Sequence, residues 1–386
     1  MRHAPWLEVV QTLMPEIRES ARAAERSGRL PEHVVARLRA TGLFRLLLPA
    51  AANGGELDPL AFVDVVEQLS CASGSVGWIV SQICVFSIQA TAMPADVVAR
   101  IWRDDPDAVV ANGLPAGGHA VAVDGGYRVT GKFAFSSGCR HATWLAAGTS
   151  VLEGGKPRLN AFGTPEIRFL FLPRHEVTFV QAWDVPGLRA TGSDQFTIDD
   201  KFVPAAFTAP STTAHTPDGR AAYAIPMILY FAAGLATVGL GIARDALDTF
   251  TEIARGRTLT GAKDRLADQP FIQHRLAEAE AVLRSARAFL RATLAEITDA
   301  AAGGAAISLE QRALLRLAST SAMHRAAEAV DLVYTAAGTA CIFGDHPLQR
   351  CFQDIHVLTQ HLQGRESHLT SVGQILLGNT NPQPFV

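Results

Sequence analysis

Charge is scarce in this sequence. Charged residues make up 18% of the 386 residues, and the formal net charge is −3. The Lys and Arg residues are scattered, with no basic block and no interleaved aromatic residues, so we expect neither a nucleic-acid interface nor binding to anionic lipid. Hydrophobic residues reach 48%. Such an apolar soluble chain is typical of helices that are buried on several faces, as in an oligomer.

Cysteine is also scarce. The chain has five cysteines, an odd number without a CxxC pair, so reduced thiols in a cytoplasmic protein are the simplest interpretation. The first twenty residues are interrupted by Pro5, Glu8, Pro15 and Glu16, which disfavours a signal peptide. No uninterrupted run of about 18 apolar residues is present, so we expect no transmembrane helix.

Three kinds of pattern follow one another along the chain. Residues 5–105 have apolar positions every three or four residues, which predicts helices. Between about 108 and 210, alternating runs separated by turn residues predict an antiparallel β domain, and the turn at 124–126 predicts a hairpin. From about 222 to 378, four long helical segments predict an up-and-down bundle, and the last of them spans 351–378 as one helix.

The predicted fold is therefore α+β and mainly α. Its order is an N-terminal helical domain (1–107), a central β domain (108–212) and a C-terminal four-helix bundle (213–386). Within the first domain, the small residues at 72–75 interrupt an apolar stretch, and the pattern leaves open whether it forms one helix or two.

Three histidines lie close together in the last predicted helix, at His356, His361 and His368. Helical metal ligands recur at i and i+3 or i+4, and these spacings do not match, so we expect no metal site. On one continuous helix, His356 would point about 140° away from His361, and His368 would lie about 10 Å along nearly the same face. His356 is therefore interpreted as structural. His368 is placed either at the mouth of a pocket or in solvent.

Three segments resemble the motifs of one known fold. They are GYRVTGKFAFSSG (126–138), GLRATGSDQFTIDDKFVP (187–204) and YTAAGTACIFGDHPLQRCFQD (334–354). Together they are similar to the acyl-CoA dehydrogenase fold over about residues 10–380. The dehydrogenases place a catalytic glutamate on the last helix, beyond the position of Asp354, but Leu362 and Gln363 stand there in this chain. The segment FAFSSGCRHATW (133–144) resembles instead the flavin-dependent two-component monooxygenases built on this fold, which hydroxylate aromatic and indolic compounds.

The resemblance implies an enzyme that takes reduced flavin, FMN or FAD, from a separate NAD(P)H:flavin reductase. It implies that molecular oxygen is the co-substrate and that a C4a-hydroperoxyflavin hydroxylates a small phenolic, indolic or polyketide molecule. It also implies a homotetramer. N-oxygenation of an amine or amino sugar is a variant of this hypothesis. The rival hypotheses are an acyl-CoA dehydrogenase that oxidises an acyl thioester, which the missing glutamate disfavours, and a non-catalytic scaffold or flavin-binding protein.

The resemblance also implies the catalytic residues. His361 takes the place of a histidine that faces the flavin. It could act as a base toward a phenol or indole, or it could protonate or orient the distal peroxide oxygen, and the sequence leaves both roles open. A hydroxyl or amide is expected to accept a hydrogen bond from the flavin N5, and the candidates are Ser136, Ser137 and Asn112. Of these, Ser137 and Asn112 are predicted to be catalytic, and Gly138 continues the same cofactor segment.

Further contacts are implied at other positions. Arg257 and Gln273 match residues that reach the cofactor of a neighbouring subunit. Gly338 and Thr339 lie on a turn that meets a cofactor phosphate or adenine. The predicted substrate-binding residues are Trp78, Phe86 and His368. Several of the hydroxylases have a histidine at the position of Phe86, so a more apolar pocket wall is expected.

Overall fold

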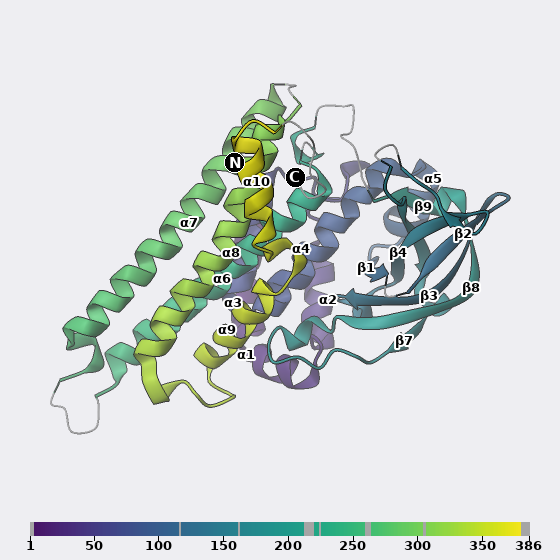
Figure 1. Ribbon diagram of the computed structural model, residues 1–386. Helices are drawn as coiled ribbons and strands as arrows, with labels where there is room; N and C mark the ends of the chain where they lie inside the picture. The colour runs from purple at the N-terminus through teal and green to yellow at the C-terminus, as the bar shows by residue number, and fades with distance from the viewer. Residues whose placement is uncertain are drawn as a thin grey trace.

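A computed structural model describes residues 4–115, 117–160, 163–211, 220–223, 225–258, 264–303 and 306–379. Figure 1 shows a sheet on one side of the molecule and long helices on the other. The helical, sheet and helical parts follow the predicted order, and the mainly α, α+β fold class is confirmed. The predicted boundary between residues 212 and 213 lies outside the described residues.

The N-terminal helices pack their apolar faces into the core. The first helix, α1 (Ala4–Ser27), buries Val10, Leu13 and Ile17 on one face. The apolar stretch at 59–90 forms two helices, because Ser73 is extended and its hydroxyl caps the second of them. The other helices of this part are α2 (Glu32–Ala40), α3 (Pro59–Ala72), α4 (Gly74–Ser87) and α5 (Ala95–Val98).

The central part of the chain forms one sheet. Its strands are β1 (Val110–Pro115), β2 (His119–Val123), β3 (Gly126–Ser136), β4 (Trp144–Glu153), β5 (Lys156–Pro157), β6 (Ile167–Pro173), β7 (Thr178–Val180), β8 (Asp194–Pro204) and β9 (Thr208–Pro210). The order β7-β8-β3-β1-β4-β6-β9 runs across the sheet, with β2 beside β3 and β4, and β5 beside β4. The predicted hairpin is present, since Val123 pairs with Gly126.

The sheet differs from the antiparallel prediction in two strand pairs. Strand β4 is parallel to both β1 and β2. Since β3 is antiparallel to β1 and β2, strand β4 runs in the direction opposite to β3. Strand β3 also contains an irregularity near its end, where Phe135 has a φ of 57° and the register with β8 shifts between Phe133 and Ser136.

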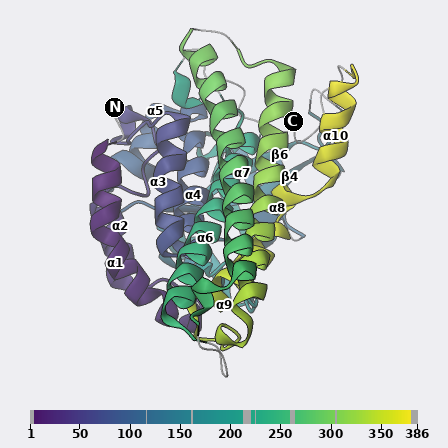
Figure 2. The ribbon, with the colours of Figure 1, turned by 90° about the vertical axis from the view of Figure 1, so that its left-hand side faces the viewer.

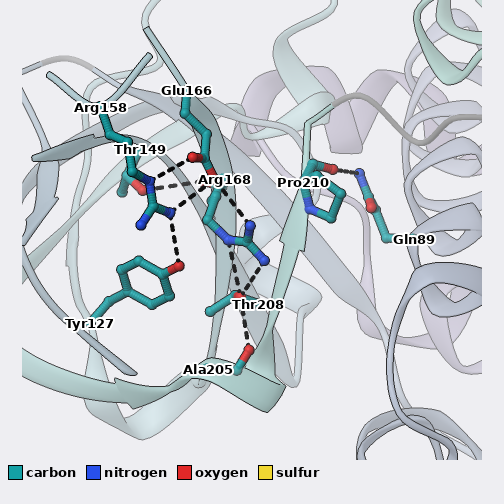
Figure 3. Close-up of polar contacts among 9 residues, drawn as sticks. All are labelled: Gln89, Tyr127, Thr149, Arg158, Glu166, Arg168, Ala205, Thr208 and Pro210. Carbon is teal, nitrogen blue, oxygen red and sulfur yellow. Dashed lines mark hydrogen bonds and ion pairs between the residues drawn. The ribbon is translucent and has the colours of Figure 1, made fainter. Parts of the chain in front are cut away.

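A polar cluster joins three strands of the β part (Figure 3). The Glu166 carboxylate accepts hydrogen bonds from Arg158 at 2.7 Å and from Arg168 at 3.0 Å. Arg158 also donates to the hydroxyl of Tyr127, and Arg168 donates to that of Thr208. The hydrogen bond from Arg158 is the main reason that the pKa of Glu166 is lowered from its ordinary value. The cluster therefore ties β3, β6 and β9 together.

The C-terminal part contains long helices that pack side by side, as Figure 2 shows for α6, α7 and α8. Helix α8 begins with a capping box in which Ser308 and Gln311 bond each other's backbone. The bounds of this part are α6 (Met227–Gly256), α7 (Pro270–Ala302), α8 (Leu309–Ala337), α9 (Pro347–Thr359) and α10 (Ser367–Leu376).

The prediction of one continuous helix over 351–378 is wrong. Helix α9 ends at Thr359 and α10 begins at Ser367, with a 3₁₀ turn at Leu362–Gly364 between them. His361 has extended backbone angles, and its ring nitrogen accepts the N–H of Gln363, so this side chain caps the turn. The angles and spacings expected for three histidines on one helix therefore do not apply.

Two helical stretches are long and apolar enough to cross a membrane by length and composition alone. They are Gly74–Ala92 and Met227–Gly256. Most of each stretch is buried inside the molecule. Their apolar side chains are therefore used in the core, as expected for helices that are hydrophobic on all faces.

Candidate active site

Three distant segments meet where the helices contact the sheet. Trp78 lies in α4, Ser137 directly follows β3, and His361 follows α9. The indole N–H of Trp78 donates to the Ser137 hydroxyl at 2.9 Å. The indole and imidazole rings of Trp78 and His361 lie edge to face, with centroids 5.3 Å apart. The structure thus brings together one residue from each predicted class: substrate-binding, cofactor-binding and catalytic.

The protonation state of His361 follows from its contacts. Its Nδ1 accepts the backbone N–H of Gln363 at 3.2 Å, and an accepting nitrogen cannot hold the ring proton of a neutral imidazole. Burial, assisted by the charge of Arg365, lowers the pKa of His361 to about 4. The ring is therefore neutral near pH 7, and its proton is on Nε2. His361 can donate a hydrogen bond from Nε2.

A chain of hydroxyl groups continues from Ser137 into the protein. Ser137 Oγ lies 2.8 Å from Ser193 Oγ, and Ser193 Oγ lies 2.8 Å from Thr191 Oγ1. Thr191 donates to the carbonyl of Leu188 at 2.7 Å. All four residues are buried. Trp78 and this chain therefore form a continuous hydrogen-bonded series, which we call the hydroxyl relay (Trp78, Ser137, Ser193, Thr191 and the carbonyl of Leu188).

The inner end of the hydroxyl relay is held by Asp354. The Leu188 backbone has left-handed angles, with φ of 52° and ψ of 32°. Its N–H donates to the Asp354 carboxylate at 2.6 Å. Burial first, and the nearby charge of Glu25 second, raise the pKa of Asp354 well above its usual range. This aspartate of α9 therefore fixes the turn that precedes β8.

Other polar atoms at this junction lack partners. Ser136 Oγ is buried and makes no hydrogen bond within the described residues, and the same is true of Gln82 Nε2, one turn beyond Trp78 on α4. Asn112 is half-buried. It lies two residues before Leu114 in β1, and Leu114 pairs with Ala134 of the antiparallel strand β3, so Asn112 lies near Ser136. Buried polar groups without partners are unusual and point to a missing ligand or water. These groups fit a ring that offers hydrogen-bond donors and acceptors, as a flavin does.

Gly138 allows the end of β3 to approach α4. Its φ is 73°, and a Cβ at this position would lie 3.1 Å from Cγ2 of Ile79. Both the left-handed backbone and the short distance favour glycine. The structure thus assigns Gly138 a role in placing Ser137, while its predicted contact with the cofactor stays a prediction.

Two predicted substrate residues lie in packed surroundings. Phe86 is fully buried, and its ring contacts Phe169 and Phe171 of β6 at centroid distances of 4.9 and 5.7 Å. This is the packing of a core residue between helix and sheet. His368 is buried, not in solvent, and its Nε2 lies 2.8 Å from the Leu362 carbonyl. His368 therefore braces the turn that holds His361.

The remaining predicted residues lie at another end of the bundle. Gln273 is exposed in the first turn of α7 and donates to the Ala267 carbonyl at 3.1 Å. Gly338 and Thr339 are exposed at the end of α8. Burial raises the pKa of the Cys341 thiol and the charge of Arg257 opposes that rise, so Arg257 lies near the same turn. Figure 1 shows that the C-terminal ends of α6 and α8 lie far from the sheet. Within one chain, these four residues do not join Trp78, Ser137 and His361.

A separate cleft of about 430 Å³ lies beside the turn between α1 and α2. Its lining includes Arg29, Arg140, His141 and Arg174, and none of the predicted site residues. Burial lowers the pKa of His141 to about 4. Among the described residues, no group of three or more His, Cys, Asp or Glu side chains could hold a metal ion. All five cysteines are free.

Sequence reasoning missed Thr191, Ser193 and Gln82 as members of the site. Thr191 and Ser193 stand in the motif GLRATGSD, but their hydroxyls acquire a role only when β8 lies beside β3. The alternation of hydroxyl residues with small residues was the available signal. Gln82 gave a weaker one, as an amide in an otherwise apolar helix.

The sequence and the fold were compared with known proteins. Residues 7–94 match the family described as acyl-CoA dehydrogenase, N-terminal domain, and residues 233–366 match acyl-CoA dehydrogenase, C-terminal domain. Indole-3-acetate monooxygenase of Pseudomonas putida is 33% identical over 91% of this chain and 88% of that protein. The oxygenase component of an FADH2-dependent resorcinol hydroxylase of Rhizobium sp. (strain MTP-10005) is 30% identical over 94% of this chain and 91% of that protein.

Solved structures agree with this likeness. The crystal structure of 3-HSA hydroxylase from Rhodococcus sp. RHA1 superposes with a TM-score of 0.90, at 27% identity, over 99% of each chain. The HsaA monooxygenase from M. tuberculosis gives a TM-score of 0.89, at 28% identity, again over 99% of each chain.

Proposed function

Because the chain belongs to the flavin-dependent monooxygenases built on the acyl-CoA dehydrogenase fold, we propose that it is the oxygenase component of a two-component hydroxylase. Its substrate would be a small aromatic molecule, phenolic, indolic or polyketide. The names of the relatives support this class, since they refer to indole-3-acetate and to resorcinol. The resorcinol hydroxylase relative is named as an oxygenase component, which supports delivery of reduced flavin by a separate NAD(P)H:flavin reductase.

The observation that supports this function best is the junction of Trp78, Ser137 and His361. Ser137, Ser136 and Asn112 would hold the flavin ring through their hydroxyl and amide groups. When bound, reduced flavin would react with oxygen to form a C4a-hydroperoxide, which supplies the electrophilic oxygen. The buried surroundings of the junction would exclude water from that reaction.

The tautomer of His361 favours one of the two roles that the sequence left open. A base must offer a lone pair, but the free nitrogen, Nε2, has the proton. Lowering the pKa from 6.5 to about 4 disfavours the imidazolium by about 3 kcal/mol, at about 1.4 kcal/mol per pKa unit. We therefore propose that His361 donates a hydrogen bond from Nε2 to an oxygen of the bound reactants. Through this hydrogen bond it would orient that oxygen, and it would not abstract a substrate proton.

A homotetramer is proposed because one chain does not complete the predicted cofactor contacts. Arg257, Gln273, Gly338 and Thr339 lie away from the junction, as expected if they reach the cofactor of a neighbouring subunit. The exposed side chain of Phe343 lies in the same α8–α9 connection and offers apolar surface to such a neighbour. Free cysteines support a reducing cytoplasmic location.

The position of Glu366 disfavours the dehydrogenase alternative. Glu366, the carboxylate that follows the turn after α9, is exposed at the start of α10. Its backbone position lies beyond the turn that holds His361. A thioester dehydrogenase would need a carboxylate at the junction, where the imidazole of His361 lies instead.

The proposal is tested by anaerobic binding followed by oxygen. The purified protein is titrated with reduced FMN and reduced FAD, and then mixed with oxygen and a panel of phenols and indoles. We expect tight binding of reduced flavin, a transient C4a adduct seen by stopped-flow absorbance, and a hydroxylated product. Bleaching of bound oxidised flavin by an acyl-CoA, without hydroxylation of any aromatic compound, would instead support a dehydrogenase.

A further inference from the structure

We propose that Thr191 and Ser193 fix the direction of the hydroxyl relay, so that Ser137 can only accept a hydrogen bond from a ligand. This polarity would make the site prefer reduced flavin over oxidised flavin. The inference rests on the proposed function, and it concerns two positioning residues that need not touch the cofactor.

The direction of the relay is set at its inner end. A backbone carbonyl has no hydrogen, so the 2.7 Å contact between Thr191 and the carbonyl of Leu188 requires that Thr191 donates. A threonine hydroxyl has one hydrogen. The 2.8 Å contact between Thr191 and Ser193 therefore requires that Ser193 donates to Thr191.

The same rule fixes Ser137. Because the hydrogen of Ser193 is already used, Ser137 must donate to Ser193 across their 2.8 Å contact. The indole N–H of Trp78 occupies one lone pair of Ser137 Oγ at 2.9 Å. One lone pair remains and no hydrogen is left. A ligand can therefore contact Ser137 favourably only by donating to it.

The carbonyl of Leu188 cannot turn to reverse this order. Asp354 holds the Leu188 N–H at 2.6 Å. The indole N–H of Trp183 also donates to the Leu188 carbonyl, at 3.1 Å. Leu188, Thr191 and Ser193 are each at most 5% exposed, so water is a poor competitor for their hydroxyls. The hydroxyl relay thus begins at a fixed acceptor, the Leu188 carbonyl, and ends at a second acceptor, the remaining lone pair of Ser137 Oγ.

The two oxidation states of flavin differ in the group that such an acceptor meets. Reduced flavin has a hydrogen on N5, whereas N5 of oxidised flavin has only a lone pair. An acceptor would form a hydrogen bond with the N5–H of reduced flavin and would repel the N5 lone pair of oxidised flavin. One neutral hydrogen bond corresponds to roughly a two- to tenfold difference in affinity. An oxygenase that receives reduced flavin and releases oxidised flavin would benefit from this discrimination.

The test compares Thr191→Val with Thr191→Ser. Valine removes the acceptor for Ser193, whose hydrogen can then turn to Ser137 and release the hydrogen of Ser137 toward the ligand. We expect the ratio of the Kd for oxidised flavin to the Kd for reduced flavin to fall by roughly two- to tenfold. Serine keeps both the donor and the acceptor, so Thr191→Ser should keep the wild-type ratio. Ser193→Ala is a second variant with the same expected direction as valine.

A second measurement, which needs no flavin, complements the ratio of the two dissociation constants. The indole N–H of Trp78 reports on Ser137, so its NMR shift in the nitrogen-15-labelled apoprotein should move in Thr191→Val and stay in Thr191→Ser. Folded Val and Ala variants with the wild-type ratio and the wild-type indole shift would overturn the inference alone. A wild-type protein that binds neither flavin would overturn the proposed function, and the inference with it.

Discussion

Replacing His361 with glutamine or with asparagine separates the two functions of this side chain. The asparagine oxygen can imitate Nδ1 and accept the N–H of Gln363, which His361 bonds at 3.2 Å. The glutamine amide N–H reaches farther and can imitate the Nε2–H donor. We expect His361→Gln to retain most of the coupling between flavin oxidation and product formation. We expect His361→Asn to keep the turn but to release hydrogen peroxide in place of product.

The expected magnitudes distinguish a hydrogen-bond donor from a base. If His361 contributes one neutral hydrogen bond, its loss costs about 0.5–1.5 kcal/mol, or roughly a two- to tenfold loss of coupling. General-base catalysis contributes about 10²–10⁴-fold, and neither amide can act as such a base. A base would therefore give a large and equal loss in both variants, whereas a donor gives a small loss in His361→Gln and a larger one in His361→Asn.

The pH dependence gives a second, independent result. Because the pKa of His361 is lowered to about 4, its neutral form persists above that pH. Protonation of Nδ1 would break its bond to the Gln363 N–H and displace the ring, so coupling would fall only as the pH approaches about 4. A histidine that acted as a base with an ordinary pKa would lose coupling below about pH 6.5.

The assay is single-turnover mixing of the reduced enzyme–flavin complex with oxygen and substrate, with product and peroxide both quantified. His361→Ala is the reference for complete loss of the side chain and should still form the flavin adduct. Loss by more than about a hundredfold in His361→Gln, together with a wild-type inflection near pH 6.5, would refute the donor role. Full coupling in His361→Ala would refute any role.

Three further predictions concern stability. Asp354→Ala leaves the buried N–H of Leu188 unpaired and should lower the free energy of unfolding by about 1–3 kcal/mol, whereas Asp354→Asn keeps an acceptor oxygen and should lose less in urea titrations. Glu166 has a lowered pKa, so its contribution to stability is present above the unfolded pKa near about 4.3 and is lost as the pH falls through the lower folded pKa. Glu166→Gln should therefore lower the melting temperature at pH 7 but not at acid pH. An equal decrease in melting temperature at both pH values would contradict the role of the ion pair. Gly138→Ala should cost roughly 1–2 kcal/mol for the left-handed backbone plus a clash with Ile79, and wild-type stability in a urea titration would contradict this reading of Gly138.

The sequence predicted elements better than it predicted their junctions. Asp124-Gly125-Gly126 located the hairpin, because a tight turn leaves a local signal. The direction of β4 relative to β1 was missed, because alternation predicts a strand but not its neighbour in the sheet. The end of helix α9 at Thr359, just before His361, was also missed. No proline interrupts residues 360–366, and the signal is a side chain that caps its own turn.

The candidate site was predicted only as far as local motifs allowed. Resemblance selected His361 and Ser137, and Trp78 was predicted separately to bind substrate; the structure places these three residues together. It did not indicate that Trp78 donates to Ser137, because that contact joins a helix to a strand far away in the sequence. Phe86 was assigned to the pocket from its position alone, and the structure shows its ring packed against Phe169 and Phe171 of β6.

A crystal structure of the protein with reduced flavin bound would test the central claim most directly. The account predicts that the flavin ring lies at the junction of α4, the end of β3 and the turn after α9. Its N5 should be within hydrogen-bonding distance of Ser137 Oγ, and His361 Nε2 should face the same cavity as the substrate. A flavin ring bound elsewhere, with Ser137 and His361 both outside its contacts, would contradict the account.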